Sequence, residues 1–397
     1  MNVLVMNPGG NSLKVEIVSC CPTQQFASEG KKLISLILEG IGKTPCLSVL
    51  DGKHPSRTEP ISAKDYGEAA TSIFHYLDKE KHVEDIHCVG VRVVHGGRIF
   101  TQATRVTAEV EREIHSFERL APLHNKSSLQ LFEPIRNRLG DVPLYAVFDT
   151  SFHRTIPDTA SLYAIPTDLA EKHGIRRFGF HGTSHRYLLE RAAHLLGKPP
   201  QEVNLVTLHL ESGCSVTAIC RGRSVDNTMG FTPLEGLMMG TRSGDVDPSL
   251  IPFLIREEHM EMDDVMTLLN KKSGLLGISN KSLDTRVLMK DYGKDPRVTQ
   301  AMDMFSYRVV KAVGAYLAVL RGADAIVFGG GIGENTPLVR ERVCASLRWC
   351  GLQLDAEKNR TLIELEGKVS TADSTLHALV VLTEEGLEIA HECIHAS

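Results

Sequence analysis

The chain has 397 residues, of which 42% are hydrophobic and 23% are charged, and its formal net charge is −5. This length exceeds what one hydrophobic core usually serves, so we expect two domains of a globular protein rather than a disordered chain. The acidic balance argues against bulk nucleic-acid binding, which needs a clustered basic face, and no apolar run reaches the roughly 18 residues of a membrane span.

The N-terminal sequence and the cysteines both favour the cytoplasm. The start, MNVLVMNPGG, lacks the basic residues and the cleavage site of a signal peptide. The nine cysteines are an odd number and form no CxxC pair, which suits free thiols in a reducing compartment better than a disulfide framework.

The first predicted elements form a hairpin. Residues 3–6 predict a short strand, 8–11 a turn, and 12–18 the return strand. Lys14 follows the turn directly. Its ammonium could therefore reach a ligand held by the turn, or it could be an ordinary exposed lysine of a strand.

Two later strands carry charged residues. Residues 88–94 are apolar except for Arg92, and a charge in such a run must be ion-paired or face a cleft. Residues 142–148 predict another strand, and Asp149 follows it. A carboxylate just past a strand's carboxyl end is where α/β sheets place site residues. We expect the first domain to end near residue 150.

A polar stretch at residues 174–187 brings together Arg176, Arg177, His181 and His185. Four side chains that carry or can carry positive charge indicate an anionic ligand. The alternative for His181 is a structural hydrogen bond, the commoner role of a single histidine.

A second strand–turn–strand unit, at residues 205–220, resembles the hairpin at residues 3–18. Two such hairpins predict two similarly built domains. Each polar turn offers backbone N–H groups to an anion, so a cleft between the domains could hold the phosphates of one nucleotide from both sides.

Residues 226–248 are too rich in glycine and proline for a helix or strand, and a long ordered loop usually lines a site. Arg242 at its centre could bind a phosphate or carboxylate through its planar guanidinium. The alternative is a solvated loop with an ordinary surface arginine.

Two C-terminal patterns complete the chain. The glycine run at residues 329–335 lies between a predicted strand and a predicted helix, which is typical of backbone that approaches a nucleotide, although a plain tight turn is the alternative. Residues 391–395 match the zinc motif HExxH. We expect no zinc there, because the motif lies where a helix frays and no third ligand follows.

Longer segments resemble one family over essentially the whole chain. They lie, in the family's order, at residues 91–97, 121–125, 147–153, 174–187, 230–248 and 329–335. On these segments the chain resembles the acetate/propionate kinase family, within the sugar kinase, Hsp70 and actin superfamily. The match around Arg242 is long and therefore specific.

The resemblance implies an α/β fold of two duplicated RNase H-like, actin-like ATPase domains with a nucleotide cleft between them. The expected N-terminal domain comprises residues 1–150 plus 384–397. The expected C-terminal domain, residues 151–383, would bind the nucleotide and dimerise.

The resemblance also implies an enzyme, a phosphotransferase with acetate kinase activity. It would transfer a phosphoryl group reversibly and in line from ATP to acetate, or to propionate, giving the acyl phosphate and ADP. Mg²⁺ would be required, with Mn²⁺ able to substitute. The expected partners are these small molecules and a second copy in a homodimer, with neither nucleic acid nor membrane.

The family's roles fall on particular residues here. Arg92 and Arg242 would hold the carboxylate and the transferred phosphoryl group, with His124, His181 and His209 along the same path. Asp149 would orient the acyl carboxylate and, with Asn7 and Glu385, hold the metal shell. The acyl pocket would comprise Val94, Leu123, Phe180 and Pro233. The nucleotide would be bound by Lys14, His209, Glu211, Ser212, Gly213, Asp284, Thr285, Arg286, Gly330, Gly331, Ile332, Gly333 and Asn335.

Three turns depart from the family's pattern. Gly10 replaces a serine, and Glu211 and Ser212 replace Gly-Asn. In the family's closing Thr-Asn-Glu-Glu, Glu384 replaces the asparagine and Gly386 replaces the second glutamate. A carboxylate beside a polyphosphate is unfavourable unless a cation neutralises it. Three possibilities follow: an ATP-dependent kinase with weakened ATP affinity, an enzyme using another donor such as pyrophosphate, or a catalytically weakened ligand-binding homologue.

Overall fold

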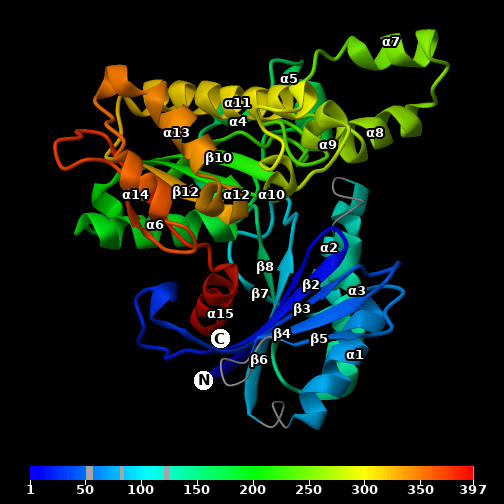
Figure 1. Ribbon diagram of the computed structural model, residues 1–397. Coiled ribbons are helices and arrows are strands. Elements are labelled where there is room, and N and C mark those ends of the chain that lie inside the picture. Colours follow the sequence, from blue (N-terminus) through cyan, green and yellow to red (C-terminus); the bar gives the residue numbers. More distant parts are fainter. Residues whose placement is uncertain (51–56, 81–84, 120–124, 397) are drawn as a thin grey trace. The chain divides into compact units, whose positions relative to one another are not determined.

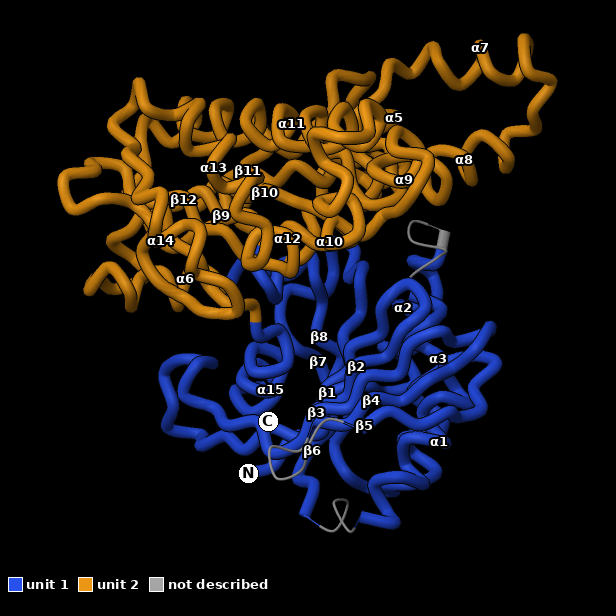
Figure 2. Tube along the Cα trace, viewed as in Figure 1, with its two compact units in different colours: residues 1–152, 182–187, 384–397 blue, residues 153–181, 188–383 orange. Residues whose placement is uncertain are grey.

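The computed structural model describes residues 1–50, 57–80, 85–119 and 125–396. The chain forms two compact units (Figure 2). Unit 1 comprises Met1–Phe152, Gly182–Tyr187 and Glu384–Ser397, and unit 2 comprises His153–His181 and Leu188–Thr383. Figure 1 labels the elements along the chain.

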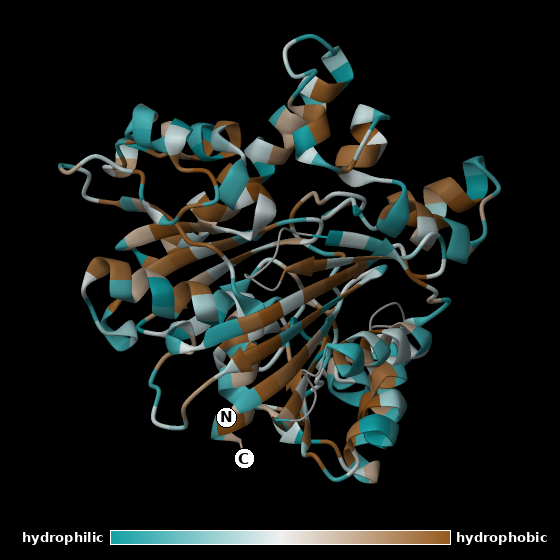
Figure 3. Cartoon of the chain, turned by 60° about the horizontal axis from the view of Figure 1, so that its bottom comes forward, coloured by the Kyte–Doolittle hydropathy of each residue, from teal (hydrophilic) through white to brown (hydrophobic). Residues whose placement is uncertain are grey.

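Unit 1 is built on a sheet with the order β5-β4-β3-β2-β1-β6-β8-β7. Its central strand, β1, pairs antiparallel with β2 and parallel with β6, and β6 pairs parallel with β8. The strands are β1 (Asn2–Pro8), β2 (Ser12–Ser19), β3 (Lys31–Glu39), β4 (Cys46–Leu50), β5 (Arg57–Pro60), β6 (Ile86–Val93), β7 (Thr104–Arg105) and β8 (Leu144–Phe148). The strands carry much of the hydrophobic colour in Figure 3, because their apolar side chains form the core.

Helices cover the sheet of unit 1. They are α1 (Tyr66–Lys79), α2 (Ala108–Ser116), α3 (Asn125–Leu139) and α15 (Glu385–His395). Helix α1 begins after Asp65, whose side chain accepts a hydrogen bond from the Glu68 N–H. Helix α15 packs against β1 and β6, and Gly90 permits this, because a Cβ there would lie 2.6 Å from the Cys393 Sγ. The C-terminal segment is therefore part of the core of unit 1.

Unit 2 contains a second sheet with the order β11-β10-β9-β12-β14-β13. Strand β9 pairs antiparallel with β10 and parallel with β12, and β12 pairs parallel with β14. The strands are β9 (Asn204–Leu210), β10 (Cys214–Cys220), β11 (Arg223–Asn227), β12 (Ala325–Gly329), β13 (Gly367–Lys368) and β14 (His377–Val380). The order β11-β10-β9-β12-β14 repeats β3-β2-β1-β6-β8, which confirms the predicted α/β class and the internal duplication.

The helices of unit 2 are α4 (Asp158–Ser161), α5 (Thr167–His173), α7 (Leu250–Glu257), α8 (Met262–Lys271), α9 (Gly274–Ser279), α10 (Thr285–Leu288), α11 (Pro296–Leu320), α12 (Gly330–Asn335), α13 (Pro337–Ala345) and α14 (Ala356–Thr361). Helix α6 (Gly182–Leu196) begins in unit 1 and continues into unit 2. Helix α11 begins sharply because Asp295 accepts hydrogen bonds from two N–H groups of its first turn and Pro296 occupies the first helical position.

The glycine run differs from expectation in one respect. We expected residues 329–335 to form a loop between strand β12 and a helix that begins near Pro337. Residues 330–335 instead form the short helix α12. Its carbonyls at Gly333 and Glu334 accept hydrogen bonds from the buried guanidinium of Arg340, which offsets the poor helix propensity of glycine. In the described part of the chain, no helix is long and apolar enough to cross a membrane.

The buried side chain of Arg340 provides a test of this arrangement. Arg340 donates hydrogen bonds to Gly333, Glu334, Asn359 and Leu362. We expect Arg340→Met to lower the free energy of unfolding by about 3 kcal/mol or more, because these buried carbonyls lose their donor. Urea denaturation followed by circular dichroism measures the change.

The matched control is Arg348→Met, because Arg348 is exposed. This variant should unfold within about 0.5 kcal/mol of the wild type. Equal stability of the two variants would show that the buried hydrogen bonds of Arg340 contribute nothing measurable.

Candidate active site

In unit 1, Arg92 is held by two neighbours. Its Nε and Nη2 donate to the two carboxylate oxygens of Asp149 at 2.7 and 2.5 Å, and its Nη1 donates to Asn7 Oδ1 at 3.0 Å. Both members of the ion pair are largely buried, with 13% of the Arg92 side chain and 1% of the Asp149 side chain exposed. Of the two alternatives expected for Arg92, an ion pair or a position facing a cleft, the structure shows the ion pair, and Asp149 orients its guanidinium.

Asn7 connects this pair to helix α15. Its Nδ2 donates to Glu385 Oε2 at 2.7 Å, while its Oδ1 accepts from Arg92. Glu385 is the first residue of α15. The ends of β1, β6 and β8 and the start of α15 thus bring together four residues that lie far apart in sequence.

Lys14 joins the same cluster because the antiparallel register of β1 and β2 places it opposite Asn7. Its Nζ lies 3.3 Å from Glu16 Oε1. Burial lowers the pKa of Lys14, but the carboxylates of Glu16, Glu384 and Glu385 raise it more, so the net shift is upward. Lys14 is therefore a cation in a strongly acidic surrounding.

This cluster fits a divalent cation chemically. Its carboxylates are Asp149, Glu16, Glu384 and Glu385, and its cations are Arg92, Lys14 and Lys32. One net negative charge and oxygen donors suit Mg²⁺, which typically takes one or two carboxylates and completes its shell with water and phosphate oxygens. The described residues include no group of three His, Cys, Asp or Glu side chains arranged to hold a metal. A Mg²⁺ site of one or two carboxylates does not require such a group.

The HExxH residues lie elsewhere in unit 1, along α15. The rings of His391 and His395 are tilted to each other with centroids 4.2 Å apart, and His395 Nδ1 lies 2.9 Å from the His391 carbonyl. Burial lowers the pKa of His391 to about 4. His391 is 7% exposed and lies on the packed side of α15.

In unit 2, His181 and Arg242 converge on one point. His181 Nδ1 lies 2.8 Å from Ser215 Oγ, and its ring centroid lies 4.2 Å from that of His209. A Cβ built on Gly213 would lie 3.3 Å from His181 Nε2 and 3.5 Å from Arg242 Nη1. Glycine at this position therefore leaves room between an imidazole and a guanidinium.

The loop that carries Arg242 is fixed by its backbone. Arg242 Nη1 donates to the Pro233 carbonyl at 2.9 Å, the Gly240 N–H donates to the Ser212 carbonyl at 3.0 Å, and the Ser243 N–H donates to the Leu269 carbonyl at 2.9 Å. The loop was predicted over residues 226–248, and the structure has no helix or strand from residue 228 to 249, but residues 226 and 227 belong to strand β11. Arg242 is therefore not an ordinary surface arginine.

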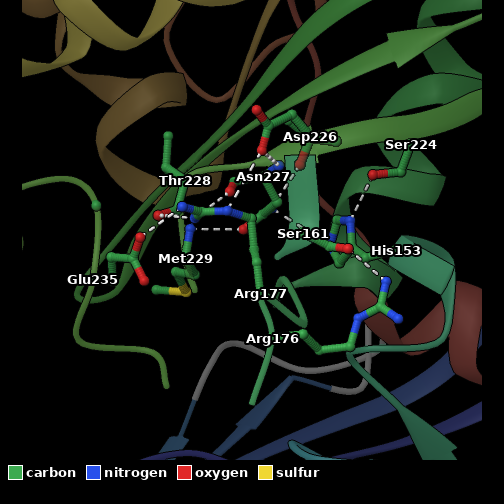
Figure 4. A network of polar contacts seen from close by, with 12 residues as sticks. His153, Ser161, Arg176, Arg177, Ser224, Asp226, Asn227, Thr228, Met229 and Glu235 are labelled. Atoms are coloured by element: carbon green, nitrogen blue, oxygen red, sulfur yellow. Dashed lines mark hydrogen bonds and ion pairs between the residues drawn. The ribbon is translucent and has the colours of Figure 1, made fainter. Parts of the chain in front are cut away.

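A partly buried polar network supports this loop (Figure 4). Arg177 Nη2 donates to Glu235 Oε1 at 2.6 Å, and Nη1 donates to the Asn227 and Thr228 carbonyls at 2.9 and 3.1 Å. Tyr163 donates to the other Glu235 oxygen. The pKa of Arg177 is raised, because Glu235 and nearby groups outweigh the opposing effect of burial.

The expectation that Arg176 and Arg177 face an anionic ligand is therefore revised. Arg177 binds the loop itself, and Arg176 Nη2 donates to Ser161 Oγ at 2.7 Å (Figure 4). Both guanidinium groups donate hydrogen bonds to oxygens of the protein. Their position close to His181 in the sequence could not reveal these partners.

Phe180, expected in the acyl pocket, is buried and its carbonyl lies 2.9 Å from His153 Nε2. Burial lowers the pKa of His153 to about 4, so this histidine is neutral near pH 7. Pro233 is also buried in unit 2, and Val94 is 7% exposed in unit 1. The remaining expected pocket residue, Leu123, and the expected path residue His124 lie outside the described residues.

The residues expected around the nucleotide gather near the ends of β9 and β12. Gly330 has φ 72°, and a Cβ there would lie 2.6 Å from the Leu210 carbonyl, so only glycine fits this close approach. The start of α12 is thereby placed against the turn that follows β9. The expected residues of this group are His209, Glu211, Ser212, Gly213, Gly330, Gly331, Ile332, Gly333 and Asn335.

Glu211 adds a negative charge to this group. Its side chain is 60% exposed, and its Oε2 lies 3.6 Å from His209 Nε2. Glu334 lies nearby and accepts from the Thr383 N–H at 2.9 Å, and burial raises its pKa, with Glu211 acting in the same direction.

Asp284, Thr285 and Arg286 lie at the start of α10. Asp284 accepts from the Arg286 N–H at 2.8 Å and from its Nη2 at 2.8 Å, and these bonds lower the pKa of Asp284. Thr285 Oγ1 lies 3.5 Å from Thr336 Oγ1, immediately after α12. The structure therefore brings the second expected nucleotide segment next to the first.

Sequence reasoning missed two residues of these clusters. Ser215 contacts His181 because the register of β9 and β10 places it opposite His209. Glu16 lies beside Lys14. The sequence contained a sign of this contact, because two charged residues two positions apart in an apolar strand project from the same face of the sheet.

Comparison with known proteins agrees with the geometry. A model of the acetokinase family matches residues 2–391. An acetate kinase of Solibacter usitatus is 40% identical over 99% of this chain and 98% of its own length. Among solved structures, the acetate kinase of Porphyromonas gingivalis matches with a TM-score of 0.90 and 36% identity, covering 100% of this chain and 99% of that one. A propionate kinase of Francisella tularensis matches with a TM-score of 0.90 and 34% identity, covering 98% of each chain. These matches confirm the resemblance, and the chain belongs to the acetokinase family.

Proposed function

We propose that the protein transfers a phosphoryl group reversibly from ATP to acetate, giving acetyl phosphate and ADP. The observation that carries this proposal is the convergence of His181 Nε2 and Arg242 Nη1 on the space above Gly213. Phosphoryl transfer proceeds through a loose transition state whose charge lies on oxygens, so an enzyme supplies positioning and positive charge rather than a covalent nucleophile.

His181 and Arg242 would contact the phosphoryl group in flight. The bond between His181 Nδ1 and Ser215 fixes the imidazole, and the bond between Arg242 and the Pro233 carbonyl fixes the guanidinium. Donors fixed before the reaction stabilise developing charge without reorganising. His209, whose ring contacts that of His181, would line the same path, and so would His124.

In unit 1, Arg92 and Val94 would bind the acyl substrate. Arg92 has five N–H donors in a planar arrangement that matches a carboxylate. Asp149 binds one edge of the guanidinium and Asn7 a third donor, which fixes its plane. In unit 2, Phe180 and Pro233 would contact the small acyl chain, as would Leu123, which favours acetate or propionate over longer acids.

Asn7 and Glu385, with Asp149, would hold Mg²⁺, and Mn²⁺ would substitute. When bound, the ion neutralises phosphate charge and orients the phosphates. Lys14, opposite Asn7, would bind the phosphates, and the group around α12 together with Asp284, Thr285 and Arg286 would bind the rest of the nucleotide.

The alternatives raised by the altered turns are less favoured. The comparisons match enzymes named acetate kinase over nearly the whole length, which argues against a ligand-binding homologue and gives no support to pyrophosphate as donor. Glu211 remains the residue expected to weaken the binding of ATP.

We further propose a homodimer in the cytoplasm. Helix α7 supports the dimer, because none of its residues is buried although its sequence is LIPFLIRE, and it stands away from the sheet within unit 2 (Figure 1). Phe253 on α7 is 51% exposed, and Met262 at the start of α8 is 53% exposed. The nine free cysteines suit a reducing compartment.

The transfer reaction is tested by acyl hydroxamate formation from acetate, ATP, Mg²⁺ and hydroxylamine. The wild type should form product, and Arg242→Ala should lower kcat by about 10²- to 10³-fold, the typical effect of removing one donor to transition-state charge. Arg297→Ala, which removes an exposed arginine of α11, is the control and should retain activity. A wild type that is inactive with ATP but active with pyrophosphate would establish the alternative donor.

Glu211→Gly should lower the KM for ATP several-fold, with Glu211→Gln giving a smaller decrease. A unit charge about 4 Å from another in water contributes about 1 kcal/mol, so removing this repulsion has a modest effect. Initial rates at varied ATP and saturating acetate measure it. An unchanged KM in both variants would show that the Glu211 carboxylate does not face the phosphates.

Phe253→Asp should convert the dimer to a monomer, because a charge is placed in an apolar contact. Light scattering coupled to size-exclusion chromatography measures the mass. Ile99→Asp, which alters an exposed apolar residue of unit 1, should remain dimeric. A dimeric Phe253→Asp variant would exclude α7 from the interface.

A further inference from the structure

Glu16 places a buried carboxylate beside the Lys14 cluster of unit 1. Glu16 lies on β2 two residues after Lys14, so both side chains project from the same face of the sheet. Only 1% of the Glu16 side chain is exposed. A buried carboxylate is costly unless cations compensate it, so its position requires an explanation.

Two ammonium groups compensate this charge. Glu16 Oε1 lies 3.3 Å from Lys14 Nζ and 3.6 Å from Lys32 Nζ. Lys32 in turn donates to both carboxylate oxygens of Glu384 at 2.7 Å. Glu16 is therefore the shared counter-ion of two lysines, one of which has its own partner.

Gly386 provides the space that this carboxylate occupies. A Cβ at position 386 would lie 1.8 Å from Glu16 Oε2 and 2.9 Å from Glu16 Cδ. Residue 386 is the second residue of α15, where acidic residues are favourable. The first turn of α15 has Glu385 and Glu388 of its own, and Glu16 of the strand adds a further carboxylate at the place of residue 386.

We propose that Glu16 is a positioning residue that holds the Lys14 ammonium in place for phosphate binding, and that Gly386 is required to admit it. The inference rests on the proposed function. The charges that face Lys14 are Glu16 on its own strand and Glu384 and Glu385 at α15. Without Glu16, the flexible lysine is attracted to Glu385 and competes with the cation proposed there.

The first test is Glu16→Gln, which keeps the shape and removes the charge. We expect the KM for Mg·ATP to rise at least fivefold, with the KM for acetate changing less than twofold. Isothermal titration calorimetry with Mg·ADP should show a matching loss of affinity, independent of turnover. Glu39→Gln, an exposed residue of β3, is the matched control and should behave as wild type.

The second test moves the carboxylate from the strand to the helix. Glu16→Ala should raise the KM for Mg·ATP, and Glu16→Ala combined with Gly386→Glu should recover at least half of the loss. Gly386→Glu alone should be impaired, because two carboxylates would then compete for one space. Recovery in the double variant distinguishes positioning from a merely structural role.

The outcomes separate the inference from the proposed function. Hydroxamate formation by the wild type tests the transfer reaction whatever the variants do. A folded Glu16→Gln variant with unchanged Mg·ADP affinity would overturn the role of Glu16, and so would a double variant no better than Glu16→Ala.

Discussion

The antiparallel pairing of two hairpins, β1 with β2 and β9 with β10, determines the polar chemistry of both units. In unit 1 this register places Lys14 opposite Asn7, and in unit 2 it places Ser215 opposite His209. Backbone hydrogen bonds fix the register, and a slip of one residue would turn every side chain to the other face. The backbone pairing therefore determines which polar residues lie opposite one another.

The sheets also explain how charges are tolerated inside the units. Parallel pairing of β6 with β8 places Asp149 within reach of Arg92 across the strand ends, and the ion pair is nearly buried. In unit 2, Arg177 lies in the segment before His181 and donates a hydrogen bond to Glu235, which lies in the loop before Arg242. The largely buried pair of Arg92 and Asp149 costs desolvation, so its value lies in orientation more than in stability. Orientation is what phosphoryl transfer requires of an enzyme.

Much of the fold followed from local patterns. The strands at residues 3–6, 12–18, 205–210 and 215–220 are apolar and interrupted by polar turns, and the structure has strands β1, β2, β9 and β10 there. Helix α12 was not expected, because a run of glycines disfavours a helix locally. The helix is stabilised by Arg340, which lies seven residues after Gly333 in the chain. Arg176 and Arg177 were assigned to a ligand for a related reason, since their partners Ser161 and Glu235 lie in other segments.

The sequence by itself determined the α/β class, the internal duplication and the family, because these depend on the order of apolar runs, turns and long motifs. It also singled out Arg92, Asp149, His181 and Arg242 as residue types in unusual surroundings. Only the tertiary structure decided which atoms meet: that both carboxylate oxygens of Asp149 bind one edge of Arg92, that His181 and Arg242 converge over Gly213, and that Glu16 fills the space left by Gly386. The physical reason is that such contacts join residues up to several hundred positions apart, and their distances depend on strand register and helix packing rather than on local sequence.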